Sequence, residues 1–278
     1  MERSGIVTLT TDFGLTDVYV GVLKGVIWTI CPQARIVDLT HQVHPQAVLE
    51  GAFLLAEACP YFPPGTVHLA VVDPGVGMER AAIALETPQA LFVAPDNGLL
   101  SCVWESLSAE ERAASRLVEL SEPRYWRSPV EAGFQPAPTF HGRDIFAPAA
   151  AHLASGLPLE ALGRPRESLV LLEGRRPFQE EDGSLVGQIV HIDRFGNCCT
   201  NIGADLVKEL AGRGEVEIAC GTLHLTGLVR TYGEGPPGRP LALIGSHGRL
   251  EIALREDSAA ARLGLHIGDI VRVRYAGR

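Results

Sequence analysis

The sequence predicts a two-part fold: an α/β N-terminal domain with a central, mostly parallel sheet flanked by helices, then a smaller all-β, barrel-like C-terminal domain. Two observations predict it. Up to about residue 165, apolar runs of strand type alternate with segments of helical periodicity, as in a sheet covered by helices. Beyond that point the helical signal thins, and short β-rich segments follow one another between glycine turns, as in small sandwiches and barrels.

The first half of the chain alternates regularly between the two patterns. The segment 16–30 has valine or isoleucine at every fourth position from Val18 to Ile30, which places them on one helix face. The run 67–72 is largely apolar, as in a buried strand, and leads directly into Asp73. In chain order, the predicted strands lie at 6–10, 36–39, 67–72, 82–85 and 91–94, and the predicted helices at 16–30, 46–58 and 144–154.

A polar connection separates the two halves. It begins near Arg164-Pro165 and includes the acidic run from Glu180 to Gly183, both of which are typical of loops. We therefore expect an N-terminal domain over residues 1–165, a linker over 166–185 and a C-terminal domain over 186–278. The strands predicted in the C-terminal domain lie at 186–192, 216–219, 223–225, 241–244, 250–253 and 270–275.

Composition excludes several classes of protein. The 278 residues are 46% hydrophobic, and 33 acidic against 24 basic side chains leave a formal net charge of −9. This hydrophobicity excludes a disordered chain, and the acidic balance argues against a nucleic-acid partner. No stretch has the roughly 18 apolar residues of a membrane span, and the N-terminus lacks a signal-peptide pattern. Six cysteines form no C-x-x-C pair. We expect a soluble cytoplasmic protein with no membrane partner and no disulfide framework.

Aspartates follow three of the predicted strands. Asp12, Asp73 and Asp193 each stand at or just beyond a strand end, where ligands bind in open α/β sheets. A carboxylate there can accept hydrogen bonds from a ribose diol or hold an ammonium group. The alternative for each is a turn or helix-capping role. Asp73 opens a glycine-rich loop that is not a P-loop, and Arg80 is near enough in sequence to pair with it.

Histidine, asparagine and serine supply the other candidates. His141 begins the last predicted helix of the first half, where it could relay a proton, pack or cap. Asn197 lies four residues after Asp193 and offers an amide fork suited to an adenine edge. Ser246 is not in a G-x-S-x-G elbow, so a serine-hydrolase triad is poorly supported. No H-E-x-x-H or other tight ligand spacing occurs, so no metal is expected.

Seven motifs in order identify a family resemblance. They are Thr10-Thr11-Asp12-Phe13-Gly14, Asp38-Leu39-Thr40-His41, Asp73-Pro74-Gly75-Val76-Gly77 with Arg80, Ala94-Pro95-Asp96-Asn97-Gly98, Thr139-Phe140-His141-Gly142-Arg143-Asp144, Asp193-Arg194-Phe195-Gly196-Asn197 and Gly248-Arg249-Leu250-Glu251-Ile252-Ala253. Over nearly its whole length the chain resembles the S-adenosyl-L-methionine (SAM) hydroxide adenosyltransferases. These adenosine-forming SAM hydrolases are relatives of the SAM-dependent fluorinase and chlorinase.

The resemblance implies a reaction, an assembly and a set of roles. The family cleaves SAM with water to adenosine and L-methionine without a cofactor, as a homotrimer with each active site at a subunit interface. By this resemblance, Asp73, Arg80 and His141 position the attacking water. Also implied are Asp12 on the ribose hydroxyls, Asp193 on the methionine ammonium, Asn197 on adenine, Tyr232 stacked on adenine, Ser246 at the methionine end, and Glu251 and Leu254 lining the adenosine.

Three other functions remain open at this point. A SAM-dependent halogenase would share the fold, although Asp73 and His141 would be poor neighbours for a halide. A non-catalytic SAM or adenosine sensor would hold the nucleoside without turnover. A metal-dependent hydrolase would use some of the nine histidines.

Overall fold

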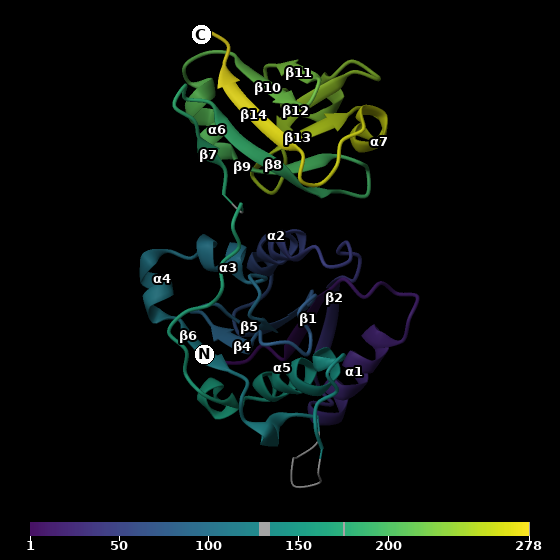
Figure 1. Cartoon of the computed structure of the whole chain (residues 1–278), viewed down its shortest axis with the longest axis vertical. Coiled ribbons are helices and arrows are strands. Elements are labelled where there is room, and N and C mark those ends of the chain that lie inside the picture. The colour runs from purple at the N-terminus through teal and green to yellow at the C-terminus, as the bar shows by residue number, and fades with distance from the viewer. Residues whose placement is uncertain (128–133, 175, 278) are drawn as a thin grey trace. The chain divides into compact units, whose positions relative to one another are not determined.

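The computed structural model describes residues 1–127, 134–174 and 176–277 (Figure 1). The chain divides into two compact units, the first spanning Met1–Leu172 and the second beginning at Glu173. Each unit has its own hydrophobic core and is described by itself. Within the described residues, no helix is both long enough and apolar enough to span a membrane.

The first unit is built on a six-stranded sheet, which confirms the predicted α/β class. Its strand order is β2-β1-β3-β5-β4-β6. The first four strands in that order are parallel neighbours, and β4 runs antiparallel to both β5 and β6. The strands are β1 (Ile6–Thr11), β2 (Arg35–Thr40), β3 (Thr66–Val71), β4 (Ala82–Glu86), β5 (Ala90–Pro95) and β6 (Arg116–Glu119).

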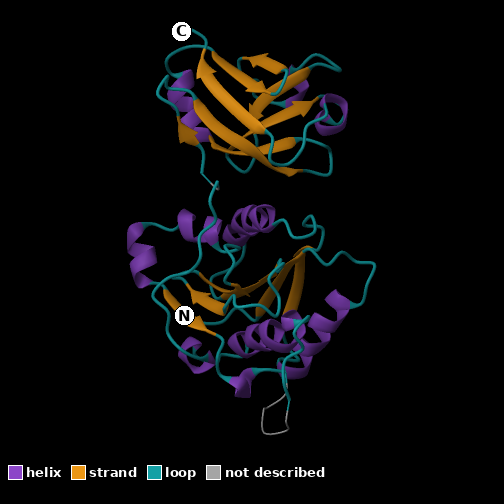
Figure 2. Ribbon diagram, in the orientation of Figure 1, coloured by secondary structure: helices purple, strands orange, loops and turns teal. Residues whose placement is uncertain are grey.

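Helices cover both faces of this sheet (Figure 2). Helices α2 (Val48–Ala58) and α3 (Ser101–Ser106) pack together on one face, and α1 (Tyr19–Ile30) and α5 (Ala147–Ala154) on the other. The short helix α4 (Ala109–Ala114) follows α3 and begins with a capping box, which satisfies its first backbone N–H groups.

Two predicted helices differ at their starts. The helix expected over 16–30 begins at Tyr19. Residues 15–18, which follow the left-handed Gly14, form a bend and not a helical turn. The helix expected over 144–154 opens with a π-helical turn, Gly142–Phe146, and α5 continues it with Pro148 in its first turn. The proline has no N–H to donate to the carbonyl of Asp144 four residues earlier, and this carbonyl accepts instead from the backbone N–H of Arg127 at 3.0 Å.

The second unit is an antiparallel, nearly closed barrel-like sheet, as predicted. Its strand order is β11-β10-β14-β8-β9-β13-β12, and β7 pairs with β8. A parallel bridge between Val229 and Leu243 brings the chain after β11 to β12, at the other end of that order. The strands are β7 (Phe178–Gln179), β8 (Leu185–Ile192), β9 (Cys198–Gly203), β10 (Val216–Cys220), β11 (Leu223–Thr226), β12 (Pro240–Ile244), β13 (Arg249–Leu254) and β14 (Ile270–Tyr275).

Some elements of the second unit were not predicted. The sequence does not predict strand β9, because its buried Thr200 and Asn201 break the apolar pattern. Helices α6 (Ala204–Ala211) and α7 (Ala259–Leu263) are short, and each covers the barrel core with few apolar residues.

A buried histidine makes the stability of the first unit depend on pH. His68 on β3 is fully buried, its Nδ1 lies 2.8 Å from the Thr8 hydroxyl, and its ring stacks on Phe92. Burial lowers the pKa of His68 to about 4. Because the folded state disfavours the charged ring, its stabilising contribution is complete above pH 6.5 and is lost as pH falls toward 4.

We therefore expect the free energy of unfolding to fall by up to about 3 kcal/mol between pH 6.5 and pH 4 through this one group. Denaturant unfolding across that range measures it. The variant His68→Gln should flatten this part of the profile, whereas His224→Gln, on exposed strand β11, should not. An unchanged slope in His68→Gln would contradict the assignment.

Candidate active site

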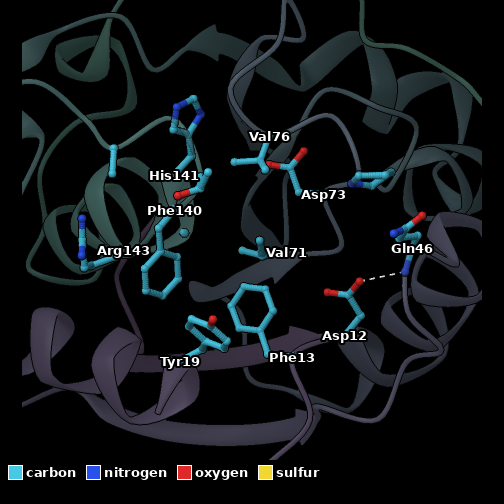
Figure 3. Close-up of a pocket in the computed structure, with 14 residues that line it drawn as sticks. Asp12, Phe13, Tyr19, Gln46, Val71, Asp73, Val76, Phe140, His141 and Arg143 are labelled. Atoms are coloured by element: carbon cyan, nitrogen blue, oxygen red, sulfur yellow. Dashed lines mark hydrogen bonds between the residues drawn. The ribbon is translucent and has the colours of Figure 1, made fainter. Parts of the chain in front are cut away.

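A pocket of about 520 Å³ opens in the first unit at the carboxyl ends of β1 and β3 (Figure 3). Thr11 pairs with Val71 in parallel register, so the residues that follow both strands emerge at the same sheet edge. The pocket is lined by Asp12, Phe13, Tyr19, Gln46, Val71, Asp73, Pro74, Val76, Ala137, Thr139, Phe140, His141, Gly142 and Arg143.

Asp12 and Asp73 both line this pocket, as strand-end aspartates should. The backbone N–H of Gln46 donates to Oδ2 of Asp12 at 2.8 Å and fixes its carboxylate (Figure 3). Gln46 adopts a left-handed backbone with φ of 67°, an uncommon conformation that presents this N–H to Asp12. Asp12 is partly exposed, so its carboxylate can still accept hydrogen bonds from a ligand.

Three aromatic rings form an apolar wall beside Asp12. Phe13, Tyr19 and Phe140 contact one another edge to face, with ring centroids 5.3–6.1 Å apart (Figure 3). They come from the turn after β1, the start of α1 and the loop before α5. The sequence does not predict this wall, because the three rings come from separate segments and no local pattern indicates that they meet.

Asp73, Arg80 and His141 form one hydrogen-bonded set. Arg80 Nε donates to Asp73 Oδ1 at 2.8 Å, and its Nη2 donates to Asp73 Oδ2 and, at 2.9 Å, to His141 Nδ1. The side chains of Asp73 and Arg80 are only 5% and 10% exposed, so water screens this ion pair little. The guanidinium also lies over the buried ring of Phe146, 5.3 Å from its centroid.

The loop that carries Asp73 is held against the loop that carries His141. Gly77 has φ of 76°, and a Cβ there would lie 2.3 Å from the carbonyl oxygen of Pro138. A side chain at this position would therefore separate the two loops. The glycine accounts for their close approach and, through it, for the spacing of Asp73 and His141.

Asp144 holds the loop that carries His141 in place through hydrogen bonds. It is fully buried and accepts hydrogen bonds from the Ala137 backbone and from the guanidinium groups of Arg127 and Arg143. Burial opposes ionisation of Asp144, but these hydrogen bonds outweigh it and lower the pKa of the carboxyl. The segment that lines the pocket is thus tied to a buried anion.

The hydrogen bond from Arg80 determines the tautomer of the His141 ring. An arginine can only donate, so Nδ1 of His141 must accept, and a neutral ring then carries its proton on Nε2. Burial lowers the pKa of His141, the Arg80 charge lowers it further, and Asp73 and Asp144 oppose the change. At neutral pH His141 is therefore a neutral ring whose Nε2–H can donate, while Asp73 is the hydrogen-bond acceptor.

The predicted residues of the second unit fall into two local groups. Asp193 and Asn197 belong to the turn between β8 and β9, where Asn197 donates to Asp193 from both its backbone and its side chain at 2.8 Å. Tyr232 donates its hydroxyl to Glu251 Oε2 at 2.7 Å. Burial opposes ionisation of Glu251, but hydrogen bonds from His247 and Tyr232 outweigh it and lower the pKa.

The remaining two predicted residues differ in their surroundings. Ser246 is exposed on the turn between β12 and β13, next to His247. Leu254 is 6% exposed and belongs to the barrel core. The structure therefore brings Asp12, Asp73 and His141 to one pocket of the first unit, where Arg80 bonds to Asp73 and His141 without itself lining the pocket. In the second unit it pairs Asp193 with Asn197 and Tyr232 with Glu251.

An α/β unit with strand-end carboxylates and a charged pocket, followed by an antiparallel barrel, defines a two-domain enzyme of small-molecule chemistry. The N-terminal domain model of the SAM hydroxide adenosyltransferases matches residues 7–163, and the C-terminal domain model matches residues 187–272. The chain belongs to this family.

Individual relatives cover almost the whole chain. The (R)-S-adenosyl-L-methionine hydrolase of Thermus thermophilus is 44% identical, over 95% of this chain and 97% of its own. A fluorinase of Nocardia brasiliensis is 32% identical, over 98% and 97%. The crystal structure of an uncharacterized conserved protein from Thermotoga maritima is 38% identical and superposes with a TM-score of 0.85, covering 96% of this chain and 99% of that one.

The state of His141 is directly testable. In Arg80→Gln we expect the pKa of His141 to rise, because the cation that disfavours its protonation is gone while Asp73 remains. Imidazole ¹H–¹⁵N NMR titration measures both this pKa and the tautomer.

His152 is the matched control, because burial alone lowers its pKa. It should titrate alike in both proteins. A protonated Nδ1 on neutral His141, or a pKa unchanged by Arg80→Gln, would contradict the assignment.

Proposed function

We propose that the chain hydrolyses SAM to adenosine and L-methionine by in-line attack of water at C5′. The observation that carries the proposal is the Asp73–Arg80–His141 set at the pocket that Asp12 also lines. Family membership supports it, as does the name of the Thermus thermophilus relative.

The chemistry of the substrate explains why such a set suffices. As water adds its oxygen to C5′, the C5′–S bond breaks and its electron pair leaves with the sulfur of neutral methionine. The sulfonium therefore needs no general acid. The difficulty lies with the nucleophile, since water is weak and must lose a proton as it attacks.

The residues of the set divide this task. Asp73 accepts a hydrogen bond from the attacking water and takes its proton. Arg80 stabilises the developing hydroxide and fixes Asp73 through two parallel hydrogen bonds. His141 orients the guanidinium through Nδ1 and offers its Nε2–H to the water oxygen. Holding the water about 3–3.5 Å from C5′ would remove much of the entropic barrier.

The other predicted residues would then hold the substrate. We assign Asp12 to the ribose hydroxyls, since it reaches the pocket beside the aromatic wall. The assignments in the second unit follow the family resemblance: Asp193 to the methionine ammonium, Asn197 and Tyr232 to adenine, Ser246 to the methionine end, and Glu251 and Leu254 to the lining of the adenosine. By the same resemblance, we propose a homotrimer in which a neighbouring subunit completes each site.

Labelled water distinguishes hydrolysis from halogenation. With SAM, chloride and fluoride in H₂¹⁸O, we expect adenosine that carries ¹⁸O in its 5′-hydroxyl, measured by mass spectrometry. The carboxylate of Asp73 repels a halide, so no 5′-halo nucleoside should form. A 5′-halo product without adenosine would establish a halogenase, and bound adenosine without turnover would establish a sensor. Either result would overturn the proposal.

Substitutions test the division of roles. In Asp73→Asn and His141→Gln we expect kcat to fall about 10²–10⁴-fold, because proton acceptance or the orientation of Arg80 is lost. Adenosine affinity should change little, as isothermal titration calorimetry would show. Asp205→Asn, an exposed carboxylate on α6, is the control and should keep full turnover. Unchanged turnover in both pocket variants would remove the catalytic assignment.

A further inference from the structure

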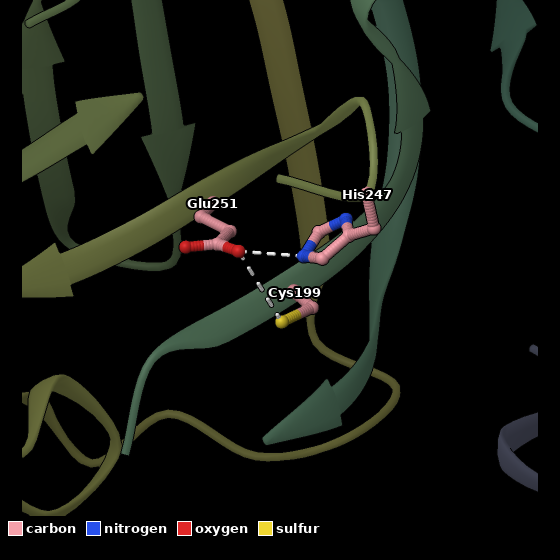
Figure 4. A group of neighbouring side chains, drawn as sticks. All are labelled: Cys199, His247 and Glu251. Carbon is pink, nitrogen blue, oxygen red and sulfur yellow. Dashed lines mark hydrogen bonds and ion pairs between the residues drawn. The ribbon is translucent and has the colours of Figure 1, made fainter. Parts of the chain in front are cut away.

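A second chemical cluster lies in the barrel of the second unit and contains none of the residues that line the Asp73 pocket. Cys199 on β9, Glu251 on β13 and His247 on the turn before β13 direct their side chains toward one point (Figure 4). Cys199 and Glu251 pair directly across the two antiparallel strands, which places both side chains on the same face.

The three side chains are close enough to share a ligand. His247 Nε2 lies 2.6 Å and Cys199 Sγ 3.8 Å from Glu251 Oε1, and all the ligand atoms lie within 4.8 Å of one another. Cys199 and Glu251 are buried, while the side chain of His247 is 16% exposed and leaves a route from solvent.

Two neighbours shape the cluster. A Cβ on Gly245 would lie 2.0 Å from Glu251 Oε1 and 2.9 Å from His247 Nε2, so only a glycine leaves room for both side chains. Tyr232 donates its hydroxyl to Glu251 Oε2 and so holds the carboxylate with Oε1 toward Cys199 and His247. Hydrogen bonds of this kind to a ligand carboxylate are typical of metal sites.

We propose that Cys199, His247 and Glu251 bind a thiophilic divalent cation of the Zn²⁺ class, with water as the fourth ligand. Tetrahedral Zn²⁺ with ordinary bond lengths separates its ligand atoms by roughly 3.3–3.6 Å. The separations of 2.6 and 3.8 Å fall on both sides of this range, and none exceeds 4.8 Å, so shifts of no more than about 1.2 Å form the site. The thiolate and imidazole select Zn²⁺ over Mg²⁺ and Ca²⁺, which prefer all-oxygen ligands.

Binding changes the protons of the cluster in a defined way. The Cys199 thiol releases its proton to solvent as the sulfur–metal bond forms. The proton that His247 Nε2 donates to Glu251 moves through solvent to Nδ1, which leaves the lone pair of Nε2 for the cation. The hydrogen bond between His247 and Glu251 is replaced by two bonds to the cation.

This cation site is separate from the proposed hydrolysis, and no step of that reaction uses the cation. Glu251 is shared, since the family resemblance assigns it to the lining of the adenosine. A cation held by Glu251 would compete with adenosine for this residue, so the nucleoside-free chain is the form to test.

Co²⁺ is the probe, because a cobalt–thiolate bond gives a charge-transfer absorption in the near ultraviolet. Co²⁺ added to the full-length, metal-free and nucleoside-free protein under reducing conditions should produce this band, saturating at one Co²⁺ per chain and displaced by Zn²⁺. Cys199→Ser should lose the band, whereas Cys59→Ser, at the end of α2 in the first unit, should keep it.

A second variant tests the site independently, in case Cys199→Ser does not fold. His247 lies on a turn, and His247→Gln should weaken Co²⁺ binding at least tenfold while leaving the circular dichroism spectrum unchanged. No cobalt–thiolate band in the unsubstituted protein, the same band in a folded Cys199→Ser, or unchanged affinity in His247→Gln would each overturn the proposal.

Discussion

The guanidinium of Arg80 bonds at once to the carboxylate of Asp73 and to Nδ1 of His141, and the chemistry of the pocket depends on this shared contact. It presents Asp73 as a fixed acceptor, and it restricts neutral His141 to the tautomer that donates through Nε2. The buried ring of Phe146 supports the guanidinium from one side. A lysine would provide the charge but not the parallel pair of hydrogen bonds to the carboxylate.

The fold places this contact where a ligand can reach it. Parallel pairing of β1 with β3 brings Asp12 and Asp73 to one edge of the sheet, about a pocket that the loop before α5 closes with Phe140 and His141. That loop keeps its form through the buried Asp144, and its distance from the Asp73 loop is set at Gly77. Gly77 and Asp144 therefore set the geometry of the two loops, while their neighbours Asp73 and His141 have the proposed catalytic roles.

Much of this was readable from the sequence, and the rest depends on tertiary structure. The strand-end positions of Asp12 and Asp73 follow from apolar runs, and the spacing of Arg80 suggested its ion pair with Asp73. The aromatic wall of Phe13, Tyr19 and Phe140 is assembled from three segments, so no local sequence pattern predicts it. The sequence does not predict the contact between Cys199 and Glu251 either, because the contact depends on the pairing register of β9 against β13. A polar strand such as β9 also lacks the apolar signal that sequence reasoning uses.

The central claim is that the pocket presents C5′ of a nucleoside to the Asp73–Arg80–His141 set. A crystal structure of the full-length protein with adenosine bound tests it most directly. The account predicts the ribose hydroxyls on Asp12 and the 5′-oxygen within hydrogen-bond distance of Asp73 or His141. Adenosine bound with its 5′-carbon directed away from this set, or bound outside the pocket, would contradict it.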